Sequence, residues 1–320
     1  MIRFGILGTA RIARAFLGFP LDGAEIQAVA SRDLHRANLF ADEFHISRRY
    51  GSYDELVADS RIDAVYIPLP PHLHCEYALK AAQWGKHVLI EKPAALSADE
   101  MRRMIVACRD RNVLFMEGFM YRFMNIHRRA KEIVQAGTIG PIRYVDFNFG
   151  FHIAIRGRTG YRTVKEMGGG ALYDLGIYGV DFLRYITEQE PVLVHTHTRR
   201  KNAQEIDEFT HAVYRAGDVI ATLTCAFTAD ANYYVLSGEE GSITAPVAIS
   251  GRSLPNVLRI HLLKGDRKYE EQFPPENPYK AETEYFAQCI ERKQEPFLNG
   301  MNSLKNLELL DRLRESSTPI

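Results

Sequence analysis

The chain has 320 residues, of which 46% are hydrophobic and 25% are charged, and 40 basic side chains balance 40 acidic ones. This length exceeds the usual size of one domain, so we expect a globular protein with two domains. The absence of net charge argues against a nucleic-acid-binding protein, and no run of 18 apolar residues predicts a membrane span.

The first part of the chain, to about residue 120, alternates apolar strands with amphipathic helices. The expected strands are Ile2–Leu7, Glu25–Ala30, Ala64–Ile67, His87–Ile90 and Val113–Glu117. Before the last of them, Ser97-x-x-Glu100 has the pattern of a capping box and predicts a helix that runs to about Arg111. The alternation predicts a parallel, right-handed, doubly wound sheet of the Rossmann type, with its ligand beyond the carboxyl ends of the strands.

A glycine-rich turn follows the first strand and reads Gly8-x-Ala10-x-x-Ala13. Alanine stands at two of the three glycine positions of the dinucleotide-binding fingerprint, and at the second its methyl group lies where the backbone should approach a pyrophosphate. By itself the turn fits both a dinucleotide site and an ordinary connection between a strand and a helix. In a dinucleotide site, backbone N–H groups at the helix start bind the pyrophosphate. The residues concerned are Gly8, Thr9, Ala10, Arg11 and Ile12.

The second strand ends at Ser31-Arg32, where a dinucleotide-binding protein contacts the adenosine ribose. A guanidinium at this place suits the 2′-phosphate of NADP, because it can donate two parallel hydrogen bonds. Asp33 lies one residue beyond the position at which NAD-binding proteins carry the carboxylate for the 2′-hydroxyl, and it could still bind that hydroxyl. The alternative for Arg32 is a surface arginine paired with Asp33. We predict NADP as the cofactor, with NAD less favoured.

After a helix at Asn125–Gln135 the pattern changes to strands separated by turns. The expected strands are Ile142–Phe151, Val192–Thr198, His211–Tyr214, Val219–Phe227, Tyr233–Leu236 and Arg259–Leu263. One long helix, Leu172–Ile186, interrupts them, and two more, roughly Ala281–Glu291 and Ser303–Glu315, close the chain. We predict a dinucleotide-binding domain at residues 1–121 and an α+β domain with a mostly antiparallel open sheet at residues 122–320.

Three residues form the predicted catalytic set, namely Lys92, Asp174 and Tyr178. Lys92 lies in Glu91-Lys92-Pro93, directly after a buried strand and at the edge of the sheet where a ligand is expected. Asp174 and Tyr178 are four residues apart on a helix that follows Gly168-Gly169-Gly170, so they share one face. Oxidation of an alcohol needs a base, and a tyrosine with a pKa near ~10 needs a nearby cation, for which Lys92 is the candidate. The alternatives are a solvated lysine and a buried tyrosine bonded to a neighbouring acid.

Several motifs occur in one order along nearly the whole chain. They are the N-terminal turn, Ile67-Pro68-Leu69-Pro70 with His74, Gly85-Lys86-His87-Val88 leading into Glu91-Lys92-Pro93, Phe119-Met120-Tyr121-Arg122-Phe123, the three glycines, Gly238-Glu239-Glu240-Gly241, and Asn277-Pro278-Tyr279. Together they resemble the glucose-fructose oxidoreductase / inositol dehydrogenase family. Tyr178 stands where many members have histidine, which is similar to the branch of NADP-dependent aldose and dihydrodiol dehydrogenases.

The resemblance implies roles for individual residues. Lys92 would bind substrate and cofactor, Asp174 would orient the substrate, and Tyr178 would transfer the proton. The cofactor-binding set would gain Pro68, Leu69, Pro70, His74, Glu91, Lys92 and Arg162. The last helix, about 303–315, would pack on the first domain. The chain departs from the family at Gly160 and Pro71, where asparagine is common.

The predicted function is hydride transfer between NADP(H) and a hydroxyl or carbonyl group of a sugar, polyol or dihydrodiol. The alternative is a sensor or regulator that binds a dinucleotide without turnover, although such a protein need not keep Lys92, Asp174 and Tyr178 together. Scattered cysteines and the lack of a zinc pattern argue against a bound metal and favour a cytoplasmic protein. We expect a homo-oligomer, a dimer or tetramer, formed through apolar residues of the second sheet at Ala221–Phe227 and Tyr233–Leu236.

Overall fold

The computed structural model describes residues 1–15, 17–200, 205–246, 249, 256–316 and 318–319, and its contacts divide the chain into two compact units. The first unit comprises Met1–Met120 and Asn277–Leu307, and the second comprises Tyr121–Glu276 and Glu308–Ile320. Sequence analysis assigned all of 122–320 to the second domain, whereas Asn277–Leu307 belongs to the first unit here. The physical reason is burial: Phe286 of this segment is fully buried, with its ring centroid 6.4 Å from that of Phe4 in the first strand.

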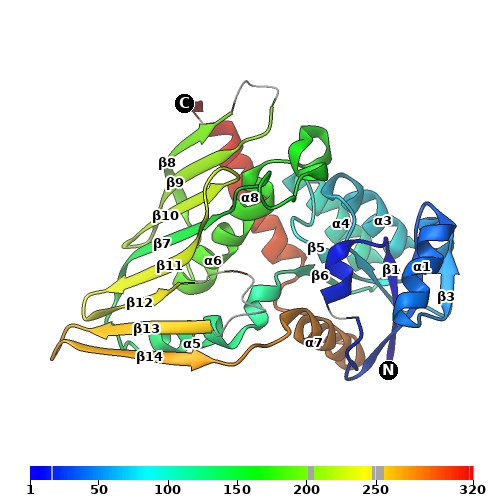
Figure 1. Cartoon of the computed structure of the whole chain (residues 1–320), viewed down its shortest axis with the longest axis horizontal. Coiled ribbons are helices and arrows are strands. Elements are labelled where there is room, and N and C mark those ends of the chain that lie inside the picture. Colours follow the sequence, from blue (N-terminus) through cyan, green and yellow to red (C-terminus); the bar gives the residue numbers. More distant parts are fainter. Residues whose placement is uncertain (16, 201–204, 247–248, 250–255, 317, 320) are drawn as a thin grey trace. The chain divides into compact units, whose positions relative to one another are not determined.

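A six-stranded sheet forms the centre of the first unit, in the order β3-β2-β1-β4-β5-β6, and the register of every neighbouring pair is parallel. Figure 1 shows its position among the helices of the unit. The strands are β1 (Ile2–Leu7), β2 (Ala24–Ala30), β3 (Arg48–Tyr50), β4 (Ala64–Ile67), β5 (His87–Glu91) and β6 (Phe115–Gly118). This order confirms the predicted doubly wound sheet, and β3 is the strand that sequence analysis missed.

The helices of the first unit cover both faces of this sheet, since every side chain of β4 is buried. They are α1 (Leu34–Phe44), α2 (Tyr53–Ala58), α3 (His74–Gln83), α4 (Ala98–Asp110), α7 (Pro278–Arg292) and the first part of α8 (Gly300–Ser316). The predicted capping box is present at α4, because the Ser97 side chain accepts a hydrogen bond from Glu100 N at 3.2 Å. Polar caps of this kind fix where each helix starts and therefore how each strand end is presented.

A nine-stranded sheet forms the second unit, in the order β14-β13-β12-β11-β7-β10-β9-β8-β15. Its strands are β7 (Ile142–Gly150), β8 (Val192–Arg199), β9 (Phe209–Ala216), β10 (Val219–Ala226), β11 (Ala231–Gly238), β12 (Gly241–Ala245), β13 (Asn256–Leu262), β14 (Arg267–Phe273) and β15 (Thr318–Pro319). The pairs β7–β10 and β8–β15 are parallel and the others are antiparallel. The predicted α+β architecture with a mostly antiparallel sheet is thus confirmed.

Helices α5 (Asn125–Gln135) and α6 (Ile177–Thr187) contact this sheet through β13 and through β7 and β10, respectively (Figure 1). A Cβ atom at Gly179 would lie 2.4 Å from Leu223 Cδ1 and 2.9 Å from Phe147 Cδ1, so this glycine lets α6 approach the strands closely. The α6 helix and the residues just before it are therefore held rigidly against β7 and β10.

The side chains expected to contact a partner subunit point into this interior. Ala221, Leu223, Tyr234 and Leu236 are fully buried, and the Tyr234 ring lies 4.5 Å from that of Phe182 on α6. The opposite face of the same strands is exposed or half-buried and mixes apolar with polar side chains, for example Ile220 and Tyr233 with Thr222 and Thr224. Period-2 alternation along a strand explains the difference, because one face of each segment fills the core and the other does not.

Candidate functional site

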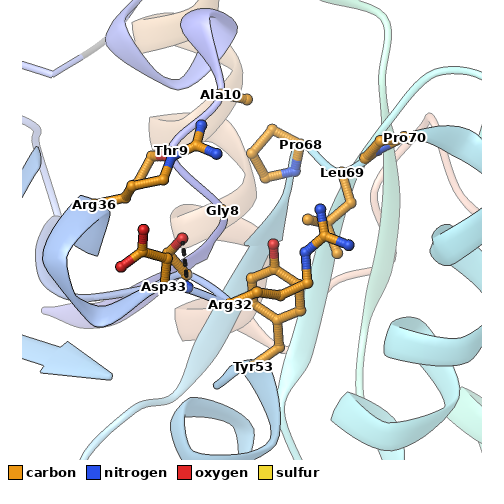
Figure 2. A pocket seen from close by; sticks show the side chains of 11 residues that line it. Gly8, Thr9, Ala10, Arg32, Asp33, Arg36, Tyr53, Pro68, Leu69 and Pro70 are labelled. Atoms are coloured by element: carbon orange, nitrogen blue, oxygen red, sulfur yellow. Dashed lines mark hydrogen bonds between the residues drawn. The ribbon is translucent and has the colours of Figure 1, made fainter. Parts of the chain in front are cut away.

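A cavity of about 340 Å³ lies beyond the carboxyl ends of β1, β2 and β4 (Figure 2). It is lined by Gly8, Thr9, Ala10, Ser31, Arg32, Asp33, Arg36, Tyr53, Pro68, Leu69 and Pro70. Eight of these lining residues were predicted to bind a cofactor from the sequence: Gly8, Thr9, Ala10, Ser31, Arg32, Pro68, Leu69 and Pro70. The structure brings these separate segments together as parallel strand ends require.

Gly8 shapes the floor of this cavity. Its φ angle is +110°, and a Cβ atom there would lie 3.1 Å from Leu69 Cδ2. Any other residue would therefore strain the turn and fill the space in which a ligand can approach the backbone. The turn leads into a short 3-10 helix at Arg11–Ala15, where the sequence had suggested an α-helix. Such a short helix carries little dipole, so the lining groups and their charges matter more than the dipole here.

Arg32 and Arg36 supply positive charge at this cavity. Both side chains are exposed, and neither forms an ion pair with a carboxylate among the residues that the structure describes. The Asp33 carboxylate caps α1 instead, because its Oδ1 accepts a hydrogen bond from His35 N at 2.8 Å. The surface pair of Arg32 with Asp33, the alternative considered above, is therefore not formed. Figure 2 shows both arginines beside the cavity.

Sequence reasoning missed Arg36 and Tyr53 as lining residues. Arg36 lies in the first turn of α1, four positions after Arg32, and this spacing on a helix start could have indicated it. Tyr53 gave no comparable signal, because its place depends on how α2 packs on the sheet.

Lys92 lies in the turn that follows β5, and hydrogen bonds to buried groups fix this turn before and after the lysine. The Tyr66 hydroxyl donates to Glu91 Oε1 at 2.7 Å, and Ala94 N donates to Glu117 Oε1 at 2.8 Å. Glu282 on α7 lies nearby, and burial, then the charges of Glu91 and Glu117, raise its pKa well above the usual range. Two buried carboxyl groups, those of Glu117 and Glu282, thus lie near the segment that carries the lysine, which the sequence did not reveal.

His74 has a structural position instead of a place in the cavity lining. The ring is fully buried, with Nε2 2.7 Å from Leu69 O and Nδ1 2.8 Å from Pro93 O. Burial lowers the pKa of His74 to about 4 against the opposing effect of the two carbonyl groups, so the ring is neutral at pH 7. It connects the cavity segment at Leu69 to the segment that carries Lys92.

Other residues predicted to contact the cofactor also lie outside this cavity lining. They are Arg11, Ile12, Glu91, Lys92 and Arg162. Arg11 is exposed on the short 3-10 helix, and Arg162 belongs to the second unit.

Asp174 and Tyr178 lie at the start of the central helix of the second unit. The sequence predicted one helix at Leu172–Ile186, whereas the structure has a π-helical turn at Leu172–Gly176 followed by α6. Such π turns are rare in proteins, and those that occur are often found at functional sites. Asp174 is 4% exposed and Tyr178 is 6% exposed. The Tyr178 ring is held by edge-to-face contacts with Tyr121 and Phe149, at centroid distances of 6.0 and 5.7 Å.

Two of the three glycines before this turn are required by the close approach of neighbouring atoms. A Cβ atom at Gly169 would lie 2.7 Å from the carbonyl oxygens of Arg162 and Val164. One at Gly170, whose φ is +120°, would lie 2.2 Å from Asp207 Oδ1. The Asp207 carboxylate in turn accepts a hydrogen bond from Leu172 N at 2.7 Å, which anchors the π turn.

Arg162 pairs with the candidate catalytic acid. Its Nε lies 2.7 Å from Asp174 Oδ2, so the segment before the glycines and the π turn are joined by a charge-assisted hydrogen bond. Because Asp174 lies four residues before Tyr178, the Arg162 contact fixes the turn directly before the helix that carries the tyrosine.

Neither a membrane-crossing helix nor a metal-binding group was found within the described part of the chain. The helices there are too short or too polar to cross a membrane. The same residues contain no cluster of three or more histidine, cysteine, aspartate or glutamate side chains that could hold a metal ion.

Comparison with known proteins identifies the family. Residues 2–119 match a model described as "Oxidoreductase family, NAD-binding Rossmann fold", and residues 127–244 match one described as "GFO/IDH/MocA C-terminal domain". D-xylose 1-dehydrogenase (NADP(+)) 2 of Haloferax volcanii is 33% identical, over 98% of this chain and 97% of that protein. The chain belongs to the GFO/IDH/MocA oxidoreductase family. The predicted family, fold class and enzyme class are thereby confirmed.

Other relatives of this GFO/IDH/MocA oxidoreductase have related activities. Mouse trans-1,2-dihydrobenzene-1,2-diol dehydrogenase is 32% identical over 86% of this chain and 80% of its own length. A 3-ketoreductase from Actinomadura kijaniata, solved with NADP and TDP-benzene, has a TM-score of 0.90 at 28% identity and covers 100% of this chain and 98% of its own. Aldose-aldose oxidoreductase from Caulobacter crescentus, complexed with glycerol, has a TM-score of 0.90 at 26% identity, with coverage of 98% and 97%.

Proposed function

We propose that this member of the GFO/IDH/MocA family transfers a hydride between NADP(H) and a hydroxyl or carbonyl group of a polyhydroxylated small molecule. The substrate classes are aldoses, cyclic polyols and dihydrodiols. The observation that supports NADP most directly is the pair Arg32 and Arg36 at the cavity, without carboxylate partners among the described residues. The names of the xylose and dihydrodiol dehydrogenases and of the NADP-bound ketoreductase agree with it.

The cavity residues fit this cofactor. The open backbone at Gly8 leaves room for a pyrophosphate, and two guanidinium groups suit a 2′-phosphate, which a carboxylate would repel. When bound, the nicotinamide supplies the hydride acceptor or donor. The remaining predicted cofactor contacts are also part of the proposal, namely those from Arg11, Ile12, His74, Glu91, Lys92 and Arg162.

We assign substrate binding and proton transfer to Lys92, Asp174 and Tyr178. We propose that Tyr178 takes the proton from the substrate hydroxyl, that Lys92 binds the same oxygen, and that Asp174 orients the substrate through a neighbouring hydroxyl. The nearly complete burial of Asp174 and Tyr178 supports this assignment, because a dry environment strengthens the interactions that each group makes.

A substrate panel tests the proposal. NADP⁺ is incubated with aldoses and polyols, and reduction is followed at the nicotinamide absorbance band. Tyr178→Phe, which removes one oxygen, should lower turnover by ~10²–10⁴-fold while the NADP dissociation constant stays nearly unchanged. Retention of more than about a tenth of the turnover would assign proton transfer to another group. NADP binding without turnover on any substrate would favour the sensor.

Two further properties belong to the proposal. We propose a homo-oligomer, a dimer or tetramer, that uses the open face of the nine-stranded sheet, where Tyr144, Ile220 and Tyr233 are exposed. Ile220→Lys should then lower the mass measured by light scattering, whereas Ile155→Lys, on an exposed residue away from that face, should not. A monomeric wild type would contradict the proposed oligomer.

We also propose a cytoplasmic location, because four buried free thiols suit a reducing compartment.

A further inference from the structure

We propose that the Tyr53 hydroxyl donates a hydrogen bond to the ribose–diphosphate part of the dinucleotide, which NADP and NAD share. This inference rests on the proposed function and adds to it a cofactor contact that the sequence did not reveal. Arg32 and Arg36 would distinguish NADP from NAD, whereas Tyr53 would contribute to the binding of both.

The Tyr53 side chain combines deep burial with a polar group at the cavity. The residue is 7% exposed and lines the cavity beyond β1, β2 and β4. A Cβ atom at Gly8 would lie 3.9 Å from the Tyr53 hydroxyl oxygen, so the polar end of the side chain reaches the floor of the cavity. Figure 2 shows the ring with its hydroxyl pointing away from the start of α2.

This hydroxyl forms no hydrogen bond with any residue that the structure describes. Buried polar groups in proteins are almost always hydrogen-bonded, and phenylalanine would fill the same space without a polar atom to satisfy. The acceptor for the Tyr53 hydroxyl is therefore water or a ligand in the cavity. A dinucleotide that displaces this water has to replace its hydrogen bond, or binding loses affinity.

The Tyr53 ring is held in place by the first unit itself. Tyr53 is the first residue of α2, directly after the capping residue Ser52. Its ring packs edge to face on that of Tyr77 in α3, with centroids 5.0 Å apart. The next residue, Asp54, pairs with Lys80 of α3 at 2.7 Å. The hydroxyl is thus oriented before a ligand arrives, which lowers the entropic cost of using it in binding.

The position of the hydroxyl indicates which part of the cofactor it contacts. In dinucleotide-binding folds, the turn after the first strand binds the pyrophosphate, and the end of the second strand binds the 2′ position of the adenosine ribose. The Tyr53 hydroxyl lies beside Gly8 of the first turn, whereas Arg32 and Arg36 lie beyond β2. Tyr53 is therefore assigned to the ribose–diphosphate part, and the 2′-phosphate to the arginines.

The turn after β1 explains why a side-chain donor is useful here. Ala10 stands at the second fingerprint position, where its methyl group limits the approach of the backbone to the pyrophosphate. The turn leads into the short 3-10 helix Arg11–Ala15, which carries little dipole. Both features reduce what backbone N–H groups contribute to anion binding. A tyrosine O–H group directed to the same place supplies a further donor.

The test compares Tyr53→Phe with Tyr77→Phe, which removes the same oxygen from a ring outside the cavity lining. Fluorescence titration measures the dissociation constants of NADPH and NADH. Displacement of NADPH measures that of ADP-ribose, which lacks the 2′-phosphate and the nicotinamide. Tyr53→Phe should weaken all three by a similar factor of about 3- to 100-fold, the range for one hydrogen bond to a polar or charged acceptor. Tyr77→Phe should bind all three as the wild type does.

Two further measurements separate this contact from other roles. Arg32→Ala should give a different pattern in the same assay, with weaker binding of NADPH and unchanged binding of NADH and ADP-ribose. Urea unfolding without cofactor tests for a structural role of the hydroxyl. Since no described residue bonds to it, Tyr53→Phe should keep the unfolding free energy of the wild type.

Three outcomes would overturn the inference. The first is binding of NADH and ADP-ribose by Tyr53→Phe within about threefold of the wild type. The second is weaker binding of NADPH alone, which would assign Tyr53 to the 2′-phosphate. The third is a marked loss of unfolding free energy in Tyr53→Phe, which would assign the hydroxyl to the fold. A wild type that binds neither dinucleotide would overturn the proposed function as well, whereas an active wild type with unchanged binding in Tyr53→Phe overturns only this contact.

Discussion

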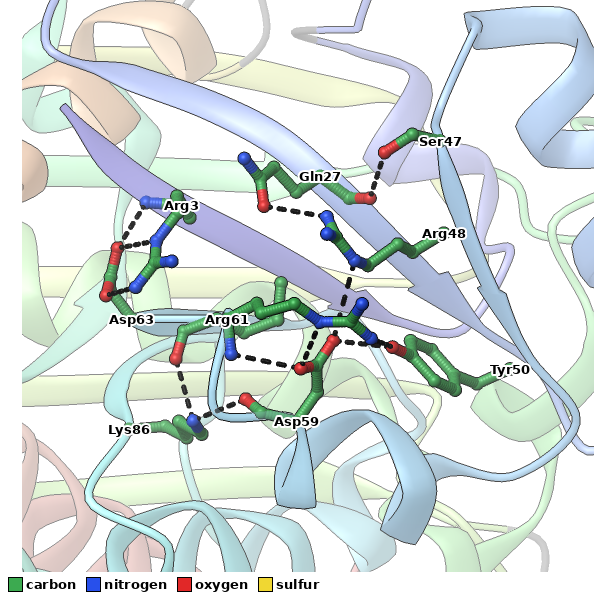
Figure 3. A network of polar contacts seen from close by, with 10 residues as sticks. Arg3, Gln27, Ser47, Arg48, Tyr50, Asp59, Arg61, Asp63 and Lys86 are labelled. Carbon is green, nitrogen blue, oxygen red and sulfur yellow. Dashed lines mark hydrogen bonds and ion pairs between the residues drawn. The ribbon is translucent and has the colours of Figure 1, made fainter.

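Arginine side chains stand at both ends of the six-stranded sheet, and their surroundings differ. Around the amino-terminal ends of β1, β4 and β5 they are paired, as Figure 3 shows. Arg3 Nη2 lies 2.6 Å from Asp63 Oδ1, and Arg61 Nε lies 2.8 Å from Asp59 Oδ1. At the carboxyl-terminal ends, Arg32 and Arg36 have no carboxylate partner within the described part of the chain.

Two lysines lie on either side of β5, and different roles are assigned to them. Lys86 precedes the strand, and its Nζ donates to the carbonyl oxygens of Asp59 and Ile62, both at 2.7 Å (Figure 3). Lys92 follows the strand and belongs to the proposed catalytic set. The comparison teaches that cations at one edge of the sheet satisfy protein groups, whereas under the proposed function those at the other edge would bind an anionic cofactor and a substrate. Variants at one edge should therefore change stability, and variants at the other should change binding or turnover.

The largest effect is expected at the lysines. Lys92→Met should lower turnover by ~10²–10⁴-fold, the range for loss of a group that acts on the reacting proton or oxygen, with little change in unfolding free energy. Lys86→Met should do the reverse, because two buried carbonyl groups lose their donor. Steady-state kinetics and urea unfolding of both variants check this. A destabilised Lys92→Met with normal turnover would remove the contrast.

The next effect concerns cofactor affinity. Arg32→Ala should weaken NADP binding by ~1–3 kcal/mol, the range for a charge-assisted hydrogen bond, and barely change NAD binding. Arg36→Ala should act in the same direction. Fluorescence titration of both cofactors measures the effect, with Arg3→Ala as the control at the opposite edge. Tighter binding of NAD than of NADP by the wild type would refute the prediction.

A smaller effect is expected for stability at the amino-terminal edge. Asp59 is nearly buried, and although burial alone would raise its pKa, hydrogen bonds from Arg61 and Tyr50 hold that pKa well below the usual range. Asp59→Asn should cost ~1–2 kcal/mol of unfolding free energy, because the Arg61 and Tyr50 donors lose a charged acceptor. Asp63→Asn, at a more exposed carboxylate, should cost less, ~0–1 kcal/mol. Equal losses, or impaired NADP binding in Asp59→Asn, would contradict the comparison.

The smallest effect is a dependence of stability on pH at the carboxyl-terminal edge. The folded pKa of His74, about 4, is below its unfolded value of about 6.5, so protons bind the unfolded chain first. His74 therefore disfavours folding progressively as pH falls from about 6.5 to about 4, with a loss below ~1 kcal/mol between pH 7 and 6. His74→Gln should flatten this slope, and His35→Gln, on an exposed histidine, should not. Urea unfolding at several pH values checks it; identical slopes in wild type and His74→Gln would exclude His74 as the origin.

Much of the fold could be predicted because local patterns carry it. Short, mainly apolar segments predicted β1, β4 and β5, and the serine before α4 predicted where that helix starts. Strands without such a pattern were missed. β14 reads RKYEEQF and lies at the edge of its sheet, where charged side chains are usual and no alternation is required. β3 has only three residues and is half-exposed.

The sequence by itself determined the alternation of strands and helices in the first unit and the residues at the ends of its parallel strands, because periodicity and turn chemistry are local properties, and its ordered motifs indicated the family. Only the tertiary structure decided that Asn277–Leu307 belongs to the first unit, that Asp33 caps a helix, and that Arg162 pairs with Asp174. Each of these depends on which distant groups share a buried environment. Burial and charge compensation arise between segments, so no spacing within one segment could show them.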